Sequence, residues 1–128
     1  MVPEVDKWGS KLLSFGSVWS LGLFLAAVSG AQTPERSLTR VVYEFAVAGL
    51  CGTQDREVVA GYHREVAAIT ARGGYDEETA RQHRLRGWVE ADEEWSNRGL
   101  GGNRAWCQSE GLAAARHFKA IARGQLAP

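Results

Sequence analysis

Two cysteines, Cys51 and Cys107, constrain the fold of this chain more than any other feature. They lack the C-x-x-C spacing of a redox motif and the C-x-x-C-H pattern of haem attachment, and two thiols so far apart are weak zinc ligands. Outside the cytosol such a pair oxidises to a disulfide. A bond across so long a loop disfavours the unfolded chain by roughly 4 kcal/mol. We therefore expect one structural disulfide and no metal or other cofactor.

The first 31 residues indicate the compartment. Two lysines precede the apolar core LGLFLAAV at 21–28, and Ser29 and Ala31 are the small residues that a signal peptidase accepts. We expect a signal peptide over residues 1–31, cleaved before Gln32, and a periplasmic or secreted protein.

A retained membrane anchor is the alternative. Residues 12–28 approach the length of an apolar segment that spans a bilayer, although serine and glycine dilute them. On that hypothesis the protein has one span and an exported domain, and this is the only contact with a membrane that we expect.

Composition and charge fit one small domain over residues 32–128. The whole chain has 128 residues, with 15 basic and 15 acidic side chains, and 45% of its residues are hydrophobic. Because nucleic-acid binding relies on a basic surface, the balanced charge argues against a nucleic acid as the main partner.

Four stretches carry the capping residues and glycine stops of helices. The first two are expected to start at Thr33, followed by Pro34, and at Thr53; the second closes at Arg72 and Gly73. The third starts at an Asp76 cap followed by two glutamates and ends at Arg98 and Gly99, and the fourth starts at Asn103.

Apolar residues recur at three- and four-residue steps in each stretch, so each helix should turn one side toward a core. The expected stripes are Leu38, Val41, Val42, Phe45 and Gly49; Val58, Val59, Tyr62, Val66 and Ile69; Leu85, Trp88, Val89 and Trp95; and Cys107, Gly111, Ala114, Phe118 and Ile121. No stretch alternates with the period of a strand. The sequence therefore predicts an all-α fold, a small four-helix bundle with one disulfide between the first and fourth helices.

The order of these features resembles a family of short exported bacterial proteins of unknown function with two cysteines. The shared features are LCG at 50–52 after an apolar helix, a middle pair of helices, NRG at 97–99, and a cysteine that begins the last helix. The resemblance covers most of residues 38–122. It departs after NRG, where the family has an aromatic- and arginine-rich stretch and this chain has LGGNRAW. The resemblance implies an exported helical domain and carries no activity across.

Two groups of polar residues could hold a metal or act in catalysis. His63, His83 and His117 lie on different helices, but each has an arginine beside it, which disfavours a divalent cation, so we expect solvated side chains. Glu90 and Glu94 are four residues apart and could form an acid–base pair. Ion pairing with nearby arginines on a solvated face is the interpretation that we favour.

The glycine-rich segment NRGLGGNR at 97–104 is a possible anion-binding loop. Glycines ahead of a helix free its backbone N–H groups, and two arginines add positive charge. No preceding strand and no lysine–serine ending accompany the loop, so neither nucleotide-binding fingerprint applies. The residues of this candidate site are Arg98, Gly99, Gly101, Gly102 and Arg104.

Asp92 interrupts the apolar stripe of the third helix. An unpaired carboxylate buried against tryptophan is costly, so we expect an ion pair with Arg98 or Arg104, or a place at an opening of the core. The alternative is a partner-binding surface formed by Trp88, Asp92 and Trp95.

These features favour a non-catalytic exported protein that binds a protein partner or serves as an accessory subunit of a cell-envelope assembly. The sequence has no complete catalytic motif, and it is rich in tryptophan, a residue common at interfaces. A small enzyme built on the carboxylates of the third helix or on the glycine-rich loop is the first alternative. A periplasmic stress chaperone is another.

Overall fold

In a computed structural model the chain divides into two units, Met1–Gln32 and Thr33–Pro128. The structure describes residues 36–99 and 101–128, all in the second unit. The expected signal peptide and the alternative anchor lie outside the described residues. Within the described part of the chain no strand forms, and no helix is long and apolar enough to cross a membrane.

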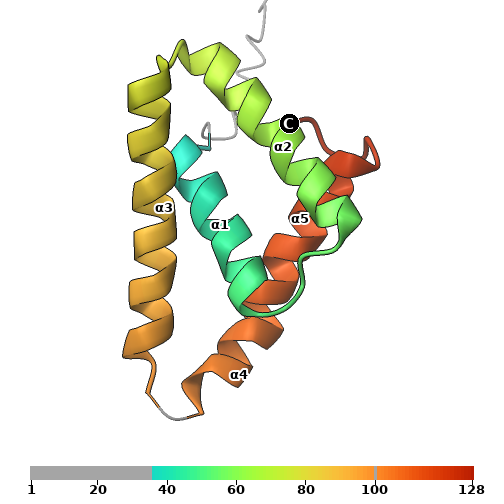
Figure 1. Ribbon diagram of the computed structural model, residues 1–128. Helices are drawn as coiled ribbons and strands as arrows, with labels where there is room; N and C mark the ends of the chain where they lie inside the picture. Colours follow the sequence, from blue (N-terminus) through green and yellow to red (C-terminus); the bar gives the residue numbers. More distant parts are fainter. Residues whose placement is uncertain (1–35, 100) are drawn as a thin grey trace, which may run out of the picture. The chain divides into compact units, whose positions relative to one another are not determined.

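The described residues form four helical segments (Figure 1). The bounds are Leu38–Leu50 for α1, Arg56–Gly73 for α2, Glu77–Asn97 for α3, Gly102–Trp106 for α4, Cys107–Gly111 for a π-helical turn and Leu112–Ala122 for α5. The last three follow one another without a break and form the fourth segment. The predicted all-helical class is confirmed.

Side-chain caps explain where the first three helices begin. Ser37, Asp55 and Asp76 each accept a hydrogen bond from the backbone N–H three residues ahead. The predicted Asp76 cap is confirmed, whereas the predicted Thr53 cap is wrong. The Thr53 hydroxyl instead donates to the Ala48 carbonyl oxygen at 3.1 Å, which fixes the turn after α1.

The first helix also begins later than expected, because Ser37 caps it and the chain enters in extended conformation there. The expected start at Thr33 and Pro34 lies outside the described residues, and the helix that the structure describes begins at Leu38. At the end of α2 the left-handed position belongs to Gly74, one residue after the expected Gly73. Helix α3 ends as predicted, with Arg98 as its C-cap and Gly99 in a left-handed conformation.

The disulfide joins Cys51, the C-cap of α1, to Cys107, where the π-helical turn begins. The two Cα atoms are 5.3 Å apart, and 56 residues separate the cysteines in sequence. Gly111 faces the bond, and a Cβ atom there would lie 2.9 Å from the Cys51 sulfur. The predicted Cys51–Cys107 bond is confirmed.

Helix α1 lies at the centre of the second unit, with α3 along one side and α2 and α5 on the other (Figure 1). Side chains of α1, α2 and α5, together with Ala80 of α3, form the larger core cluster, which contains Leu38, Val41, Val42, Val58, Tyr62, Ile69 and Phe118. A second cluster around the disulfide contains Tyr43, Ala46, Val47, Ala91 and Trp106. The core stripes predicted for α1 and α5 are confirmed at Leu38, Val41, Val42, Phe118 and Ile121.

The core-facing side of α3 differs from the prediction. Ala80, Gly87 and Ala91 are buried against α1, whereas Leu85, Trp88 and Val89 are exposed. A Cβ atom on Gly87 would lie 2.6 Å from the Thr39 carbonyl oxygen. Small side chains on α3 therefore let the two backbones approach closely, and the large apolar side chains point away from the core.

Candidate functional site

The exposed apolar side of α3 is the first candidate site. We define the outer face of α3 as Leu85, Trp88, Val89 and Asp92. The exposed fraction is 58% for Leu85, 45% for Trp88 and 44% for Val89. These are large apolar side chains that face water. Asp92 is also exposed. The face therefore combines apolar surface with a carboxylate.

Trp88 is held in place along its inner edge. Its ring meets the ring of Phe45 edge-on, with centroids 6.3 Å apart, and Phe45 in turn stacks on Tyr62 at 3.8 Å. Trp95 behaves differently. It is half-buried and packs on Trp106 in the second core cluster, with ring centroids 6.1 Å apart.

The predicted trio of Trp88, Asp92 and Trp95 is thus divided between surface and core. The predicted pairing of Asp92 with Arg98 or Arg104 is wrong within the described residues. Asp92 is exposed there, and Arg98 is bound by Glu94. Because water solvates Asp92 on the outer face, the carboxylate needs no buried partner.

The glycine-rich loop places its two arginines in different surroundings. The guanidinium of Arg98 forms an ion pair with Glu94 and lies 4.4 Å from the centre of the Trp106 ring, whereas Arg104 is exposed. Gly99 and Gly101 have positive φ angles of 69° and 82°, and Gly102 opens a helix of five residues. An anion at this loop would compete with Glu94 for Arg98. The anion-binding loop stays a prediction.

The two carboxylates of α3 that were candidates for an acid–base pair lie in different surroundings. Glu94 accepts hydrogen bonds from the Tyr43 hydroxyl and from Arg98, whereas Glu90 is exposed. The bond from Tyr43 is the main cause that lowers the pKa of Glu94 below its usual value, and Arg98 adds to it. Burial first, and then Glu94, raise the pKa of the Tyr43 phenol far above its usual value. Glu94 is therefore held as a carboxylate and Tyr43 as a neutral donor.

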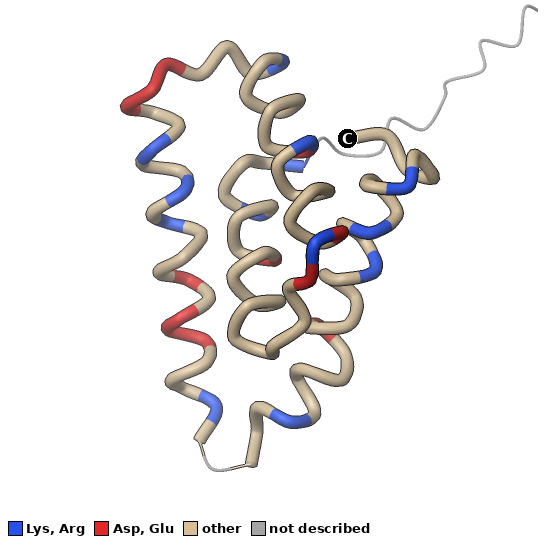
Figure 2. The backbone as a smooth tube through the Cα atoms, turned by 45° about the vertical axis from the view of Figure 1, so that its right-hand side comes forward, with Lys and Arg blue, Asp and Glu red and all other residues tan. Residues whose placement is uncertain are grey.

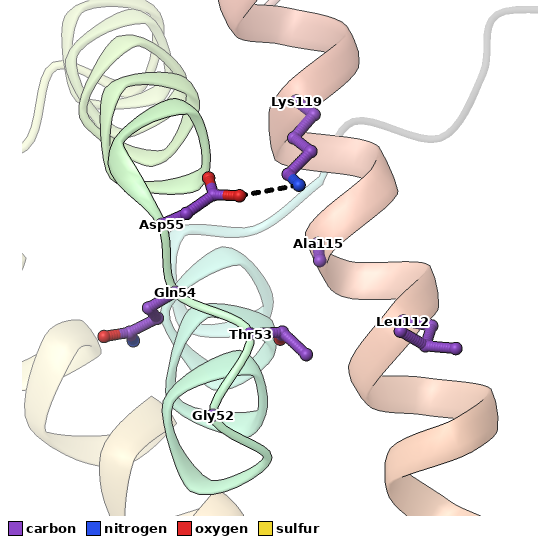
Figure 3. Close-up of a pocket in the computed structure, with 7 residues that line it drawn as sticks. All are labelled: Gly52, Thr53, Gln54, Asp55, Leu112, Ala115 and Lys119. Carbon is purple, nitrogen blue, oxygen red and sulfur yellow. Dashed lines mark ion pairs between the residues drawn. The ribbon is translucent and has the colours of Figure 1, made fainter.

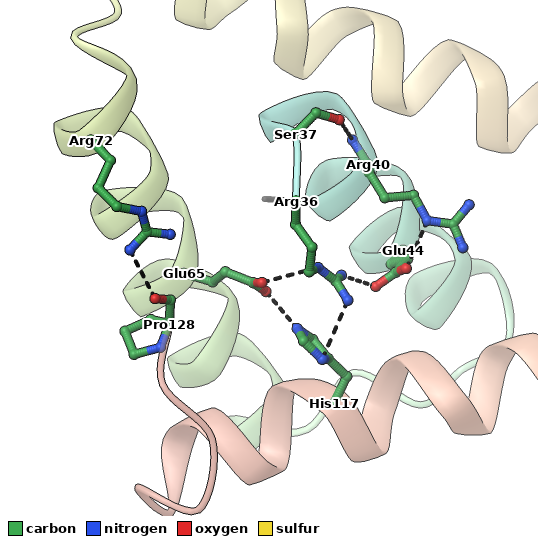
Figure 4. Close-up of polar contacts among 8 residues, drawn as sticks. All are labelled: Arg36, Ser37, Arg40, Glu44, Glu65, Arg72, His117 and Pro128. Atoms are coloured by element: carbon green, nitrogen blue, oxygen red, sulfur yellow. Dashed lines mark hydrogen bonds and ion pairs between the residues drawn. The ribbon is translucent and has the colours of Figure 1, made fainter. Parts of the chain in front are cut away.

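A polar cluster between α1, α2 and α5 was not anticipated from the sequence (Figure 4). We define it as Arg36, Arg40, Glu44, Glu65 and His117. Glu65 is 3% exposed, and its carboxylate lies 3.1 Å from Arg36 Nε and 2.8 Å from His117 Nε2. Glu44 binds Arg36, and it also binds Arg40 Nε at 2.8 Å. Each carboxylate thus has two cationic or donor partners.

The hydrogen bonds of His117 fix its tautomer. Arg36 Nη1 lies 3.3 Å from His117 Nδ1, and because a guanidinium can only donate, Nδ1 must accept. The proton of the neutral ring is then on Nε2, which donates to Glu65. Both ring nitrogens are used inside the cluster. His117 is therefore a structural link between helices and offers no free nitrogen for general base catalysis.

The other two histidines are apart from this cluster. His83 Nδ1 lies 2.8 Å from the Thr39 hydroxyl, and His63 is exposed. In residues 36–99 and 101–128 no group of three or more histidine, cysteine or acidic side chains could hold a metal ion.

A shallow hollow of about 250 Å³ lies between the start of α2 and α5 (Figure 3). The side chains at its mouth satisfy one another, because Lys119 Nζ lies 2.6 Å from Asp55 Oδ2 and Asp55 also caps α2. The hydrogen bond from Lys119 is the main cause that lowers the pKa of Asp55, and the Val58 N–H lowers it further. The other lining residues are Gly52, Thr53, Gln54, Leu112 and Ala115. This hollow presents no unused charge to a ligand.

Glu65 of the polar cluster is a buried charged residue that the sequence analysis did not identify. It lies between Tyr62 and Ile69 on the stripe that faces the core, so its position in the helical pattern is the signal that could have identified it. A charged residue at a core position implies partners from other helices.

Comparisons with known proteins add no relative. No protein-family model matches the chain, and no curated protein and no solved structure matches it significantly. The resemblance described for the sequence therefore stays an expectation.

Proposed function

We propose that this chain is an exported helical protein that acts by binding another protein, as a binding module or an accessory subunit of a cell-envelope assembly. The outer face of α3 is the proposed binding surface. One observation carries the proposal: α3 packs on α1 through alanine and glycine, and displays Leu85, Trp88 and Val89 to solvent.

The energetics of apolar surface support this assignment. Burial of apolar area contributes about 25 cal/mol per Å², so a partner that covers these side chains gains binding free energy. Contiguous apolar patches with a charged rim are typical of protein–protein contacts, and tryptophan is enriched among the residues that dominate such contacts. Because Phe45 orients Trp88 before any partner arrives, less side-chain entropy is lost on binding.

Two features of the sequence support export. Residues 1–31 have the order of a signal peptide, and the disulfide is a bond that persists in oxidising compartments. N-terminal sequencing of the native protein is the test. A chain that starts at Gln32 supports cleavage, whereas a chain that starts at Met1 and stays in the membrane pellet after a carbonate wash supports the anchor at 12–28.

Photo-crosslinking in the producing cell tests the binding surface. We replace Val89 with a photo-reactive amino acid and, as a matched control, replace Ala67, which is exposed on α2. The proposal predicts a discrete crosslinked protein band from position 89 and none from position 67. Equal labelling from both positions, or none from either, would contradict a binding role for the outer face.

A further inference from the structure

The charges along α3 alternate in blocks. Figure 2 shows acidic, basic, acidic and basic segments following one another from the start of the helix to its end. The blocks are Asp76, Glu77 and Glu78; Arg81, Arg84 and Arg86; Glu90, Asp92, Glu93 and Glu94; and Arg98. The large exposed apolar residues lie where the central basic and acidic blocks meet.

We infer that the partner of the outer face is a second copy of this chain, bound by antiparallel pairing of the two α3 helices. The inference rests on the proposed function, because it uses the same face. In a two-fold symmetric contact the same surface faces itself, so a surface can pair only if it is complementary to its own rotated image. The block pattern of α3 has this property.

A two-fold axis level with Gly87 gives the register. It sets Leu85 against Val89 of the second copy, and Arg81 against Glu93 of the second copy with Asp92 beside it. In this register the central basic block meets the central acidic block of the second copy, whereas parallel pairing sets each of these blocks against its own sign.

The contacts of α3 leave this face accessible. In the described part of the chain, α1 is the one helix with which α3 makes extensive contact. Helix α3 lies at the edge of the second unit (Figure 1). The Arg81 side chain is 59% exposed, and its partner in the monomer, Glu78, is a surface residue on the same helix. Exchange of that exposed ion pair for one with the second copy therefore costs little.

The size of the surface indicates a weak and reversible dimer. Helix α3 has 21 residues, about 31 Å at the usual rise per residue. Contact along one face of one helix buries less than the roughly 800 Å² per partner of a standard stable interface. We expect a micromolar dissociation constant that rises with salt, because exposed charge pairs are screened.

Sedimentation velocity of the native purified protein, across a concentration series at low and high salt, tests self-association. We expect a monomer–dimer equilibrium that shifts toward monomer at high salt. Val89→Glu should abolish the dimer, since it adds a carboxylate to the apolar contact. Arg116→Glu, an exposed charge reversal on α5, is the matched control and should leave the equilibrium unchanged.

Charge reversal distinguishes antiparallel pairing from other contacts. Arg81→Glu alone and Glu93→Arg alone should each weaken the dimer about tenfold or more, because a symmetric contact contains each repulsive pair twice. An equimolar mixture of the two variants should form heterodimers of wild-type affinity, since both pairs then have opposite signs. The double variant should also recover. Single variants that dissociate and a mixture that does not recover would overturn this register.

The failure of this inference is separable from the failure of the proposed function. A native protein that stays monomeric at about 100 µM and low salt overturns self-association. If position 89 then crosslinks to a protein of another mass, the proposed function stands with a different partner. If position 89 crosslinks to nothing, both fail.

Discussion

At the scale of single residues, Glu65 shows how a charge is accommodated in a helical core. Its carboxylate is nearly inaccessible to water, and its two partners come from before α1 and from α5. Desolvation of a carboxylate costs several kcal/mol, so Arg36 and His117 are needed to offset it. Through this one buried side chain, α2 is joined to α5 and to the segment that precedes α1.

We predict that Glu65→Ala destabilises the fold by about 2 kcal/mol, because it strands Arg36 and His117 without their acceptor. Urea unfolding followed by circular dichroism measures the change. Glu90→Ala, at an exposed position on α3, is the control and should shift stability by less than about 0.5 kcal/mol. Equal effects of the two substitutions would show that the cluster adds nothing to stability.

At the scale of elements, contact between helices depends on two glycines. Gly87 lies against the backbone of α1, and Gly61 lies against the backbone of α5, where an added Cβ atom would be 1.8 Å from the Phe118 carbonyl oxygen. Both are helical positions at which glycine is intrinsically unfavourable. Close approach of the backbones compensates for that cost.

We predict that Gly87→Ala destabilises the fold by about 1–3 kcal/mol, because the added methyl group pushes α3 away from α1. Gly49→Ala is the matched control. Its Cβ atom would meet the far end of the exposed Gln54 side chain, which can move if it gives up its hydrogen bond to the Phe45 carbonyl oxygen. The gain in helix propensity offsets that loss, so this variant should be about neutral. Thermal unfolding of both variants decides the question. A stable Gly87→Ala variant would contradict the close packing of α3 on α1.

The helix caps predict how stability depends on pH. A hydrogen bond from the Thr79 backbone N–H, followed by one from the Thr79 side chain, lowers the pKa of Asp76 below its usual 3.8. The hydrogen bond from Lys119 is the main cause that lowers the pKa of Asp55 below the same value. A lowered folded-state pKa means that the ionised form favours the folded state. This contribution is complete above about pH 5 and is lost as pH falls through the usual value toward the lowered one.

We therefore expect the melting temperature to fall between about pH 5 and pH 3. Asp76→Asn keeps a good capping side chain without an ionisable group, so its melting temperature should depend less steeply on pH. A pH profile of Asp76→Asn that is parallel to that of the wild type would exclude the cap as a source of the dependence.

At the scale of the whole molecule, the disulfide connects parts of the second unit that are distant in sequence. It ties the end of α1 to the start of the π-helical turn, and the second core cluster surrounds it. Because a domain of this size buries a modest fraction of its surface, a covalent link adds a large share of its stability.

We predict that reduction lowers the free energy of unfolding by about 4 kcal/mol, as expected for a loop of this length. Urea unfolding of the native protein with and without a reductant is the measurement, and it needs no substitution. Coincident unfolding curves, with reduction verified by thiol labelling, would show that the bond does not contribute to stability.

The sequence alone determined the helical class, the cysteine pair and the limits of α3. The limits of α3 depend on residues within about one turn of each end, because Asp76 caps the first turn and Gly99 ends the helix. The disulfide depends only on the number of cysteines, because two cysteines allow one intramolecular bond.

Only the tertiary structure decided which side of α3 is buried and how Glu65 is paired. The apolar pattern favoured Leu85, Trp88 and Val89 as core residues, but the close fit of Gly87 and Ala91 against α1 determined the packing. Hydrophobicity favours burial of any large apolar side chain, whereas the face that is buried depends on how near the partner's backbone can come. That distance is a property of two helices together, and neither segment of sequence contains it.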